Sequence, residues 1–213
     1  MTISAAHPSP GRLVARRLPA KRAVDLAGAA TLLLLTLPLM AAVYLLIRAT
    51  CPGPAVFRQV RAGRHGRPFA MLKFRTMHHG AHAARAALAP QNEAGGHLFK
   101  LRHDPRVTRV GRLLRRLSLD ELPQLVNVLR GEMSLVGPRP LLLEDSGYTG
   151  RARDRLLVAP GLTGLWQVRG RSNLPWEEML RLDLHYVENL SLRLDLGILL
   201  RTVPAVLTGR GAH

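Results

Sequence analysis

The chain is organised around Ser118-Leu119-Asp120-Glu121-Leu122-Pro123-Gln124. Pro123 has no backbone N–H and clashes with the preceding turn inside a helix, so a helix tolerates it only in its first turn. The sequence therefore predicts a helix that starts with Asp120 as N-cap and ends at Gly131. A capping box that starts at Ser118 is the competing register. Either register puts two adjacent carboxylates at a helix N-terminus, where the dipole favours their charged form.

Arginines surround the two carboxylates of Asp120 and Glu121. An isolated aspartate at a helix start is most often only a cap. Carboxylates beside several guanidinium groups instead suit a site that handles phosphates, because arginine forks match phosphoryl oxygens. The arginines in question are Arg109, Arg112, Arg115 and Arg116 before the pair, Arg130 after it, and Arg139 within Gly137-Pro138-Arg139-Pro140.

The composition limits the class of protein. With 213 residues the chain suffices for one ordinary domain and a little more. Its net charge of +17 with only 4% aromatic residues indicates an anionic partner: nucleic acid, a phospholipid surface or a phosphorylated substrate. One cysteine, Cys51, excludes an intramolecular disulfide framework and provides no metal motif, so a reducing, cytoplasmic setting is the simplest for the polar part.

One hydrophobic stretch, Leu26 to Ile47, is long enough to enter a membrane. It has no charged residue, and as a helix it would reach about 33 Å, the thickness of a bilayer core. Pro38 in its middle predicts a kink or break. Basic residues crowd both ends, although the positive-inside rule places them on one. A re-entrant hairpin with its turn at Leu37-Pro38 explains both features. An ordinary kinked span is the alternative, and the sequence does not decide between them.

The sequence predicts three regions: a basic, disordered tail (1–19), a membrane helix broken at Pro38 (20–50), and one domain (51–213). In that domain, Ala55–Val60 and Phe69–Met77 read as short strands, with Lys73 and Arg75 on one face. His78, His79 and His82 read as a solvated cluster, because no acidic or cysteine partner stands nearby.

Two helices of the domain are predicted to be amphipathic. Val107–Leu117 has an apolar stripe and an arginine face. A second helix shows apolar residues at three- and four-residue steps, namely Trp176, Leu180, Leu184, Val187 and Leu190. The apolar stretch Leu192–Leu207 is too short for a clean span, which favours surface or core burial. The predicted fold class is α+β and mainly helical: a re-entrant membrane helix, a small cytosolic domain with interfacial helices, and a short β element.

Several ordered motifs together resemble one family. They are Lys73-Phe74-Arg75-Thr76-Met77, Asp104 to Gly111, Ser118 to Gln124, Gly131 to Pro140, and Pro160 to Val168. In this order and spacing they resemble the bacterial sugar transferases, the monotopic polyprenyl-phosphate phosphoglycosyl transferases. The resemblance extends from about Lys21 to His213, and several motifs at compatible spacing are far more specific than any single short pattern.

The resemblance implies an enzyme at the cytoplasmic face of the bacterial inner membrane. It would transfer a sugar 1-phosphate from a UDP-sugar, with glucose or galactose favoured, to undecaprenyl phosphate and release UMP, as the first step of exopolysaccharide or lipid-linked glycan assembly. Asp120 would be the nucleophile that forms a covalent phosphosugar intermediate. Asp120 and Glu121 would hold Mg²⁺. Arg139 would bind phosphate, assisted by Lys73, Arg75 and Arg115.

Two other classes of protein also fit the charge. A nucleic-acid-binding module leaves the membrane-length segment unexplained. Aromatic residues for base stacking are scarce and no recognised binding motif is present, so no nucleic-acid partner is expected. A non-catalytic scaffold on anionic membrane lipids explains the basic helices and the anchor. It gives no reason for the Asp120–Glu121 pair to coincide with the whole motif set.

Overall fold

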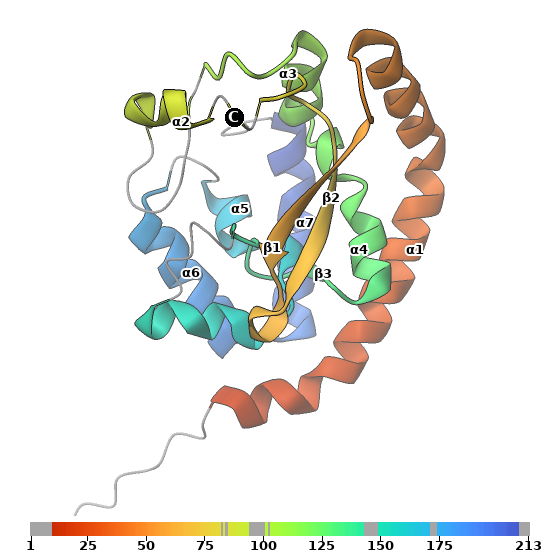
Figure 1. The fold of residues 1–213 in the computed structure, drawn as a ribbon. Coiled ribbons are helices and arrows are strands. Elements are labelled where there is room, and N and C mark those ends of the chain that lie inside the picture. The colour runs from red at the N-terminus through yellow and green to blue at the C-terminus, as the bar shows by residue number, and fades with distance from the viewer. Residues whose placement is uncertain are drawn as a thin grey trace, which may run out of the picture.

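The computed structural model describes residues 10–81, 83, 85–93, 101, 103–142, 149–170 and 174–208. A 41-residue helix, α1 (Pro10–Thr50), lies along one side of a domain of short helices and two small sheets (Figure 1). The predicted tail therefore becomes helical at Pro10. Proline is favoured in the first turn of a helix, and good helix formers follow it. Residues 1–9 lie outside the described part.

Helix α1 is continuous through Pro38, so the predicted break at this position is wrong. Proline removes one backbone hydrogen bond, and a long helix can absorb that loss as curvature, which Figure 1 shows in α1. The part from Pro19 to Thr50 is long and apolar enough to cross a membrane by length and composition. Its two ends nevertheless pack on the same domain: Ala29 belongs to the main core, and Val43 and Ile47 to a second one.

Strands β1 (Val56–Ala62) and β2 (Pro68–Phe74) form an antiparallel hairpin, which confirms the predicted β element. Helix α4 (Gln124–Arg130) packs between this hairpin and α1 (Figure 1). The fully buried Asn127 joins α4 to β2, because its Oδ1 accepts from the Leu72 N–H (3.0 Å) and its Nδ2 donates to the Ala70 carbonyl (2.8 Å). The side-chain amide thus serves the edge of β2 as another strand would.

Helix α3 (Arg109–Arg116) confirms the predicted arginine-bearing helix. Thr108 caps it by accepting the Gly111 N–H at 2.8 Å. Helix α4 ends at Gly131, as predicted, with the left-handed φ of 83° that glycine favours. It starts only at Gln124, however, with Pro123 as its N-cap residue, so both predicted registers for its start are wrong. The proline cannot donate a helical hydrogen bond, and the helix forms only beyond it.

The remaining elements build the core behind the hairpin. Strands β3 (Ser134–Val136) and β4 (Gly161–Thr163) pair in parallel, and a Cβ on Gly161 would lie 2.0 Å from the Gly137 nitrogen, so only glycine fits this approach. Around them lie the 3-10 helix η4 (Gly150–Leu157) and helices α5 (Leu165–Arg169), α6 (Trp176–Glu188) and α7 (Leu192–Thr208). The buried face of α6 is formed by Met179, Leu182, Asp183, Tyr186 and Val187, so the predicted stripe is confirmed only at Val187 and at Leu190 just beyond the helix.

Candidate active site

The two carboxylates lie in a tight turn between α3 and α4. Residues Leu119–Glu121 form a 3-10 helix, η3, which follows Ser118 in the left-handed region (φ 54°). This turn packs against β2, and the turn therefore presents Asp120 and Glu121 to side chains from three other segments.

Glu121 is held by two cations. Its Oε1 accepts from Lys73 Nζ at 3.2 Å, and Arg139 donates to both of its oxygens, at 3.2 Å for Nη1 to Oε2. Burial acts to raise the pKa of Glu121, but Arg139 and Lys73 outweigh it and hold the pKa well below its usual range. Glu121 is therefore an ionised anchor for both cations.

Asp120 is also buried, but unlike Glu121 it is not bound by Lys73 and Arg139. Only 7% of the residue is exposed. Within the described part of the chain, no group donates a hydrogen bond to its carboxylate, and its oxygens are not among the fully enclosed, unpaired polar atoms. Burial raises the pKa of Asp120, while Lys73 opposes this by favouring the charged form. Its oxygens are thus accessible and free to react or to bind.

Three cations gather around the two carboxylates. Lys73 comes from β2, and burial lowers its pKa although Glu121 opposes this. Arg115 comes from the last turn of α3, where its Nε donates to Thr76 Oγ1 at 3.0 Å and its charge acts on Asp120. Arg139 comes from the loop after β3. Three cations against two carboxylates leave surplus positive charge, as a diphosphate requires.

Arg75 does not join this group. Strand β2 ends at Phe74, but the alternation continues beyond it: Phe74 and Thr76 are buried, whereas Lys73 and Arg75 are half-buried. Arg75 instead donates from Nη1 to the Pro52 carbonyl at 3.0 Å. The predicted shared face of Lys73 and Arg75 agrees with this alternation, but within the described residues the Arg75 guanidinium makes no bond to Asp120 or Glu121.

Comparison with known proteins decides the family. Residues 16–209 match the family model described as "Bacterial sugar transferase". The chain belongs to the bacterial sugar transferase family. This membership confirms the resemblance that the ordered motifs predict and is consistent with a phosphoglycosyl transferase.

Three relatives illustrate the similarity of this sugar transferase to named proteins. It is 46% identical to the UDP-glucose:undecaprenyl-phosphate glucose-1-phosphate transferase of Caulobacter vibrioides, over 91% of this chain and 72% of the relative. It is 42% identical to the galactosyl transferase CpsE of Streptococcus agalactiae, over 92% of this chain and 44% of the relative. It is also 42% identical to the exopolysaccharide production protein ExoY of Rhizobium meliloti, over 91% and 88%. The chain thus spans less than half the length of CpsE.

The sugar transferase site fits Mg²⁺ through Asp120. Magnesium binds proteins through one or two carboxylates and completes its shell with water and substrate phosphates. Asp120 has accessible oxygens, whereas both oxygens of Glu121 already accept from cations. Glu121 would join as a ligand only by releasing one of these pairs. Within the described residues, no cluster of three or more histidine, cysteine or acidic side chains offers another metal site, and His82 lies outside them.

Four residues of the sugar transferase that support the site do not stand out in the sequence. Asn127 fixes β2 beside Lys73, and Arg155 donates from Nη2 to the Arg139 carbonyl at 3.0 Å. Asp183 pairs with Arg155, and Lys21 donates to the Val136 carbonyl at 3.0 Å. One signal was present: Asp183 places a charge among the apolar positions of α6, which is costly without a partner.

Proposed function

We propose that this protein transfers a sugar 1-phosphate from a UDP-sugar to undecaprenyl phosphate through a covalent Asp120 intermediate and releases UMP. The observation that carries the proposal is the contrast between two adjacent carboxylates. Glu121 is ionised and locked to Lys73 and Arg139, whereas Asp120 has accessible oxygens and no hydrogen-bond donor among the described residues. Neighbouring acids whose environments differ in this way take different chemical roles.

In the first step, an Asp120 oxygen attacks the phosphorus that carries the sugar. A P–O bond forms to Asp120, and the bond from this phosphorus to the bridging oxygen breaks. That oxygen leaves with its electron pair on UMP, and the enzyme holds an acyl phosphate. An anion that approaches a diphosphate meets charge repulsion, and Lys73, Arg115 and Arg139 supply the cations that offset it.

In the second step, a phosphate oxygen of undecaprenyl phosphate attacks the same phosphorus. The Asp120–phosphorus bond breaks, the carboxylate is restored, and the product is the sugar linked to the lipid through a diphosphate. A carboxylate nucleophile divides one difficult transfer into two easier ones. Mg²⁺, when bound at Asp120 and the substrate phosphates, would neutralise part of their charge.

Membrane association of this chemistry is supported by three exposed apolar surfaces. Much of α1 is exposed and apolar, including Leu34, Leu35 and Leu45. Leu113 and Leu117 lie exposed among the arginines of α3, an arrangement suited to anionic lipid headgroups. Helix α7 carries a stripe at helical spacing, namely Leu192, Leu196, Leu200, Val203 and Leu207.

The proposed location is the cytoplasmic face of the bacterial inner membrane. Both ends of α1 pack on one domain, and a straight crossing would carry one end of the helix to the opposite face of the bilayer. The contacts therefore support the monotopic arrangement, in which both ends of the continuous helix α1 lie at the same face of the membrane as the domain.

The proposed donors are UDP-glucose and UDP-galactose, and the proposed pathway is exopolysaccharide assembly. The Caulobacter relative is named for glucose 1-phosphate transfer from UDP-glucose, CpsE for galactosyl transfer, and ExoY for exopolysaccharide production. Since this chain matches them over more than nine-tenths of its length, these names define the substrates with which a test should begin.

The test is UMP release by detergent-solubilised protein with Mg²⁺, undecaprenyl phosphate and each UDP-sugar. We expect release that requires the lipid, prefers one sugar, and disappears in Asp120→Asn, which keeps the size of the side chain but not its charge. Thermal unfolding of the variant serves as the control for folding. A folded wild-type protein that releases no UMP from either sugar would instead favour the non-catalytic scaffold on anionic lipids.

A further inference from the structure

The loop that carries Arg139 is held from behind by a buried ion pair. Arg155, from η4, is 4% exposed, and Asp183, from α6, is 1% exposed. The Arg155 guanidinium donates to Asp183 Oδ2 from Nε at 2.8 Å and lies 2.7 Å from it through Nη2. The same Nη2 donates to the backbone carbonyl of Arg139 at 3.0 Å.

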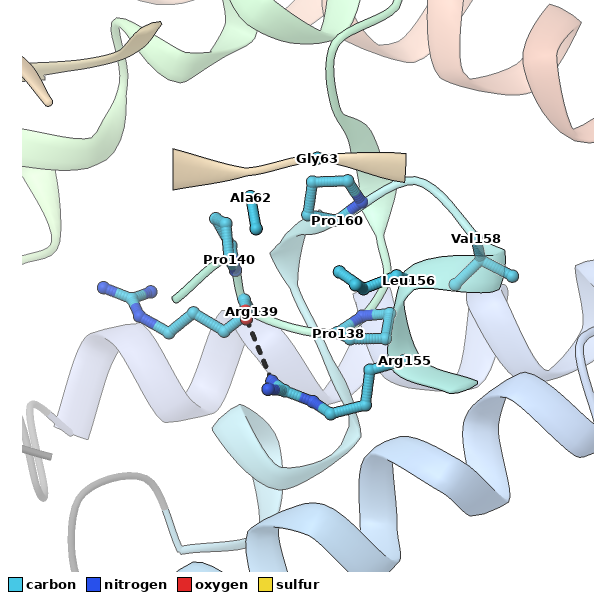
Figure 2. A pocket seen from close by; sticks show the side chains of 9 residues that line it. All are labelled: Ala62, Gly63, Pro138, Arg139, Pro140, Arg155, Leu156, Val158 and Pro160. Atoms are coloured by element: carbon cyan, nitrogen blue, oxygen red, sulfur yellow. Dashed lines mark hydrogen bonds between the residues drawn. The ribbon is translucent and has the colours of Figure 1, made fainter. Parts of the chain in front are cut away.

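Figure 2 shows how Arg155 and Arg139 lie relative to each other. The Arg139 side chain extends away from Arg155, while the dashed bond joins Arg155 to Arg139. At its other end, the Arg139 guanidinium donates to both oxygens of Glu121. The residues drawn in Figure 2 line a small pocket that both Arg139 and Arg155 border, and neither Asp120 nor Glu121 is among its lining residues.

The loop is stiff, so its anchor determines where the side chain goes. Pro138 and Pro140 bracket Arg139, and each fixes its own φ and restricts the residue before it. Arg61 Nη1 also donates to the Pro140 carbonyl, at 3.3 Å. A shift of the Arg139 carbonyl therefore moves the whole segment, and with it the guanidinium that meets Glu121.

Stability alone does not explain this pair. Replacing a buried ion pair with apolar residues is often neutral or stabilising, because the cost of desolvation offsets the attraction. Trp176, whose ring centroid lies 5.6 Å from the Arg155 guanidinium, adds a cation–π contact that arginine makes more often than lysine. The pair therefore orients the Arg155 guanidinium, which binds the Asp183 carboxylate and the Arg139 carbonyl of the loop at the same time.

We propose that Arg155, oriented by Asp183, is a positioning residue that sets the place of the Arg139 guanidinium at the Asp120–Glu121 turn. Neither residue touches the reacting phosphorus; both act through the backbone of Arg139. The catalytic consequence rests on the proposed function, whereas the fixing of the loop does not.

The first test is a double-mutant cycle on UMP release from UDP-glucose and UDP-galactose. Arg155→Lys keeps the charge but loses the fork, and Asp183→Asn keeps the volume but loses the charge. Each should lower kcat/KM by about 10- to 100-fold, the effect of a catalytic group displaced by about an ångström. In an Arg139→Ala background, Arg155→Lys should have no further effect, because the group that it positions is gone.

Arg151→Gln is the matched control. Arg151 and Glu188 also join η4 to α6, at 3.1 Å, but their side chains are 76% and 52% exposed and neither bonds to the loop. This variant should keep wild-type kcat/KM. Full activity in Arg155→Lys and Asp183→Asn would overturn the proposal. An equal loss from Arg155→Lys with and without Arg139 would overturn it as well, since a merely structural role predicts that result.

Hydrogen exchange of the segment Gly137–Leu142 provides a readout that needs no activity. Exchange there should accelerate in Asp183→Asn and stay at the wild-type rate in Arg151→Gln, with the β1–β2 hairpin unchanged in both. Unchanged exchange in Asp183→Asn would overturn the positioning role even if the wild type is active. If the wild type releases no UMP, the proposed function fails, and the exchange still decides whether Arg155 and Asp183 fix the loop.

Discussion

At the scale of single residues, the different environments of Asp120 and Glu121 predict that a covalent intermediate forms on Asp120. Incubated with its UDP-sugar but without undecaprenyl phosphate, the wild type should gain the mass of one hexose phosphate on the peptide that contains Asp120. Asp120→Asn should gain none. Glu121→Gln should still form the adduct, but on the order of 10- to 100-fold more slowly, because Lys73 and Arg139 lose the anion that places them.

Intact-protein and peptide mass spectrometry measure this outcome directly. An adduct on Asp120→Asn, or one located on another residue in the wild type, would contradict the assignment of the nucleophile. Arg139→Ala is informative in the same assay: it should weaken the response to nucleotide sugar while leaving Asp120 able to react.

The charges around Asp120 also predict a pH dependence. Burial raises the pKa of Asp120 and Lys73 lowers it. Since only the ionised carboxylate attacks, activity is present above this pKa and is lost as the pH falls through it. Removal of the cation in Lys73→Met should raise the pKa further, so the acid limb of kcat/KM should move to higher pH. Arg151 pairs with Glu188 and not with the Asp120–Glu121 turn, so Arg151→Gln should leave the acid limb unchanged. A limb that stays or moves to lower pH in Lys73→Met would show that another group controls it.

At the scale of elements, Asn127 links helix α4 to strand β2. Asn127→Ala removes the bonds to Leu72 N–H and the Ala70 carbonyl. Leaving buried partners unpaired costs about 1–3 kcal/mol, so the unfolding temperature should fall by about 3–10 °C. Activity should fall too, because Lys73 follows Leu72 directly. The measurement is thermal unfolding in detergent. Asn189→Ala is the control, since Asn189 is exposed and bonds only within its own turn; an equal fall in both variants would contradict the role of Asn127.

Elements with local signals are the ones that the sequence predicts correctly. The apolar stripe of α3, the alternation in the hairpin and the glycine that ends α4 each depend on neighbours within a few residues. The parallel pair β3–β4 has only three residues in each strand, too few for a periodic pattern. In α6, the buried side chains of Asp183 and Tyr186 bond to partners from other elements. A pattern of apolar residues alone therefore identifies only part of the buried face.

In the candidate site, too, features with a local sequence signal are predicted and features that depend on long-range contacts are not. The Asp120–Glu121 pair, Lys73 and Arg139 come together as the motifs predict. Arg75 does not, because its guanidinium donates to the Pro52 carbonyl instead. Arg155 and Asp183 are 28 positions apart, and their connection to the site appears only in the structure, where Arg155 bonds both to Asp183 and to the Arg139 carbonyl. Long-range polar contacts of this kind leave no local signal in a sequence.

At the scale of the whole molecule, the start of α1 is part of the domain and not only a membrane flank. Lys21 is buried, donates to the Val136 carbonyl, and pairs with Asp195 at 2.7 Å, 174 positions away. Arg22 donates to the Val128 and Leu129 carbonyls at the end of α4. These two residues look like ordinary membrane-flanking cations in the sequence. In the structure Lys21 fixes the helix to the strand that leads into the Arg139 loop, and Arg22 fixes it to the end of α4.

This attachment predicts the topology of α1. Lys21 and Asp25 bind one end of the helix to the domain, and Val43 and Ile47 pack the other end against the same domain. Ala20 and Arg58, exposed on either side of the apolar stretch, should therefore face the same compartment. In a Cys51→Ser background, Ala20→Cys and Arg58→Cys should both react with a membrane-impermeant maleimide in inverted vesicles, and neither should react in right-side-out vesicles. Cys51→Ser alone reports the background. A helix that crosses the bilayer would expose one cysteine on each side, and such a result would require the domain to release one of its two contacts with α1.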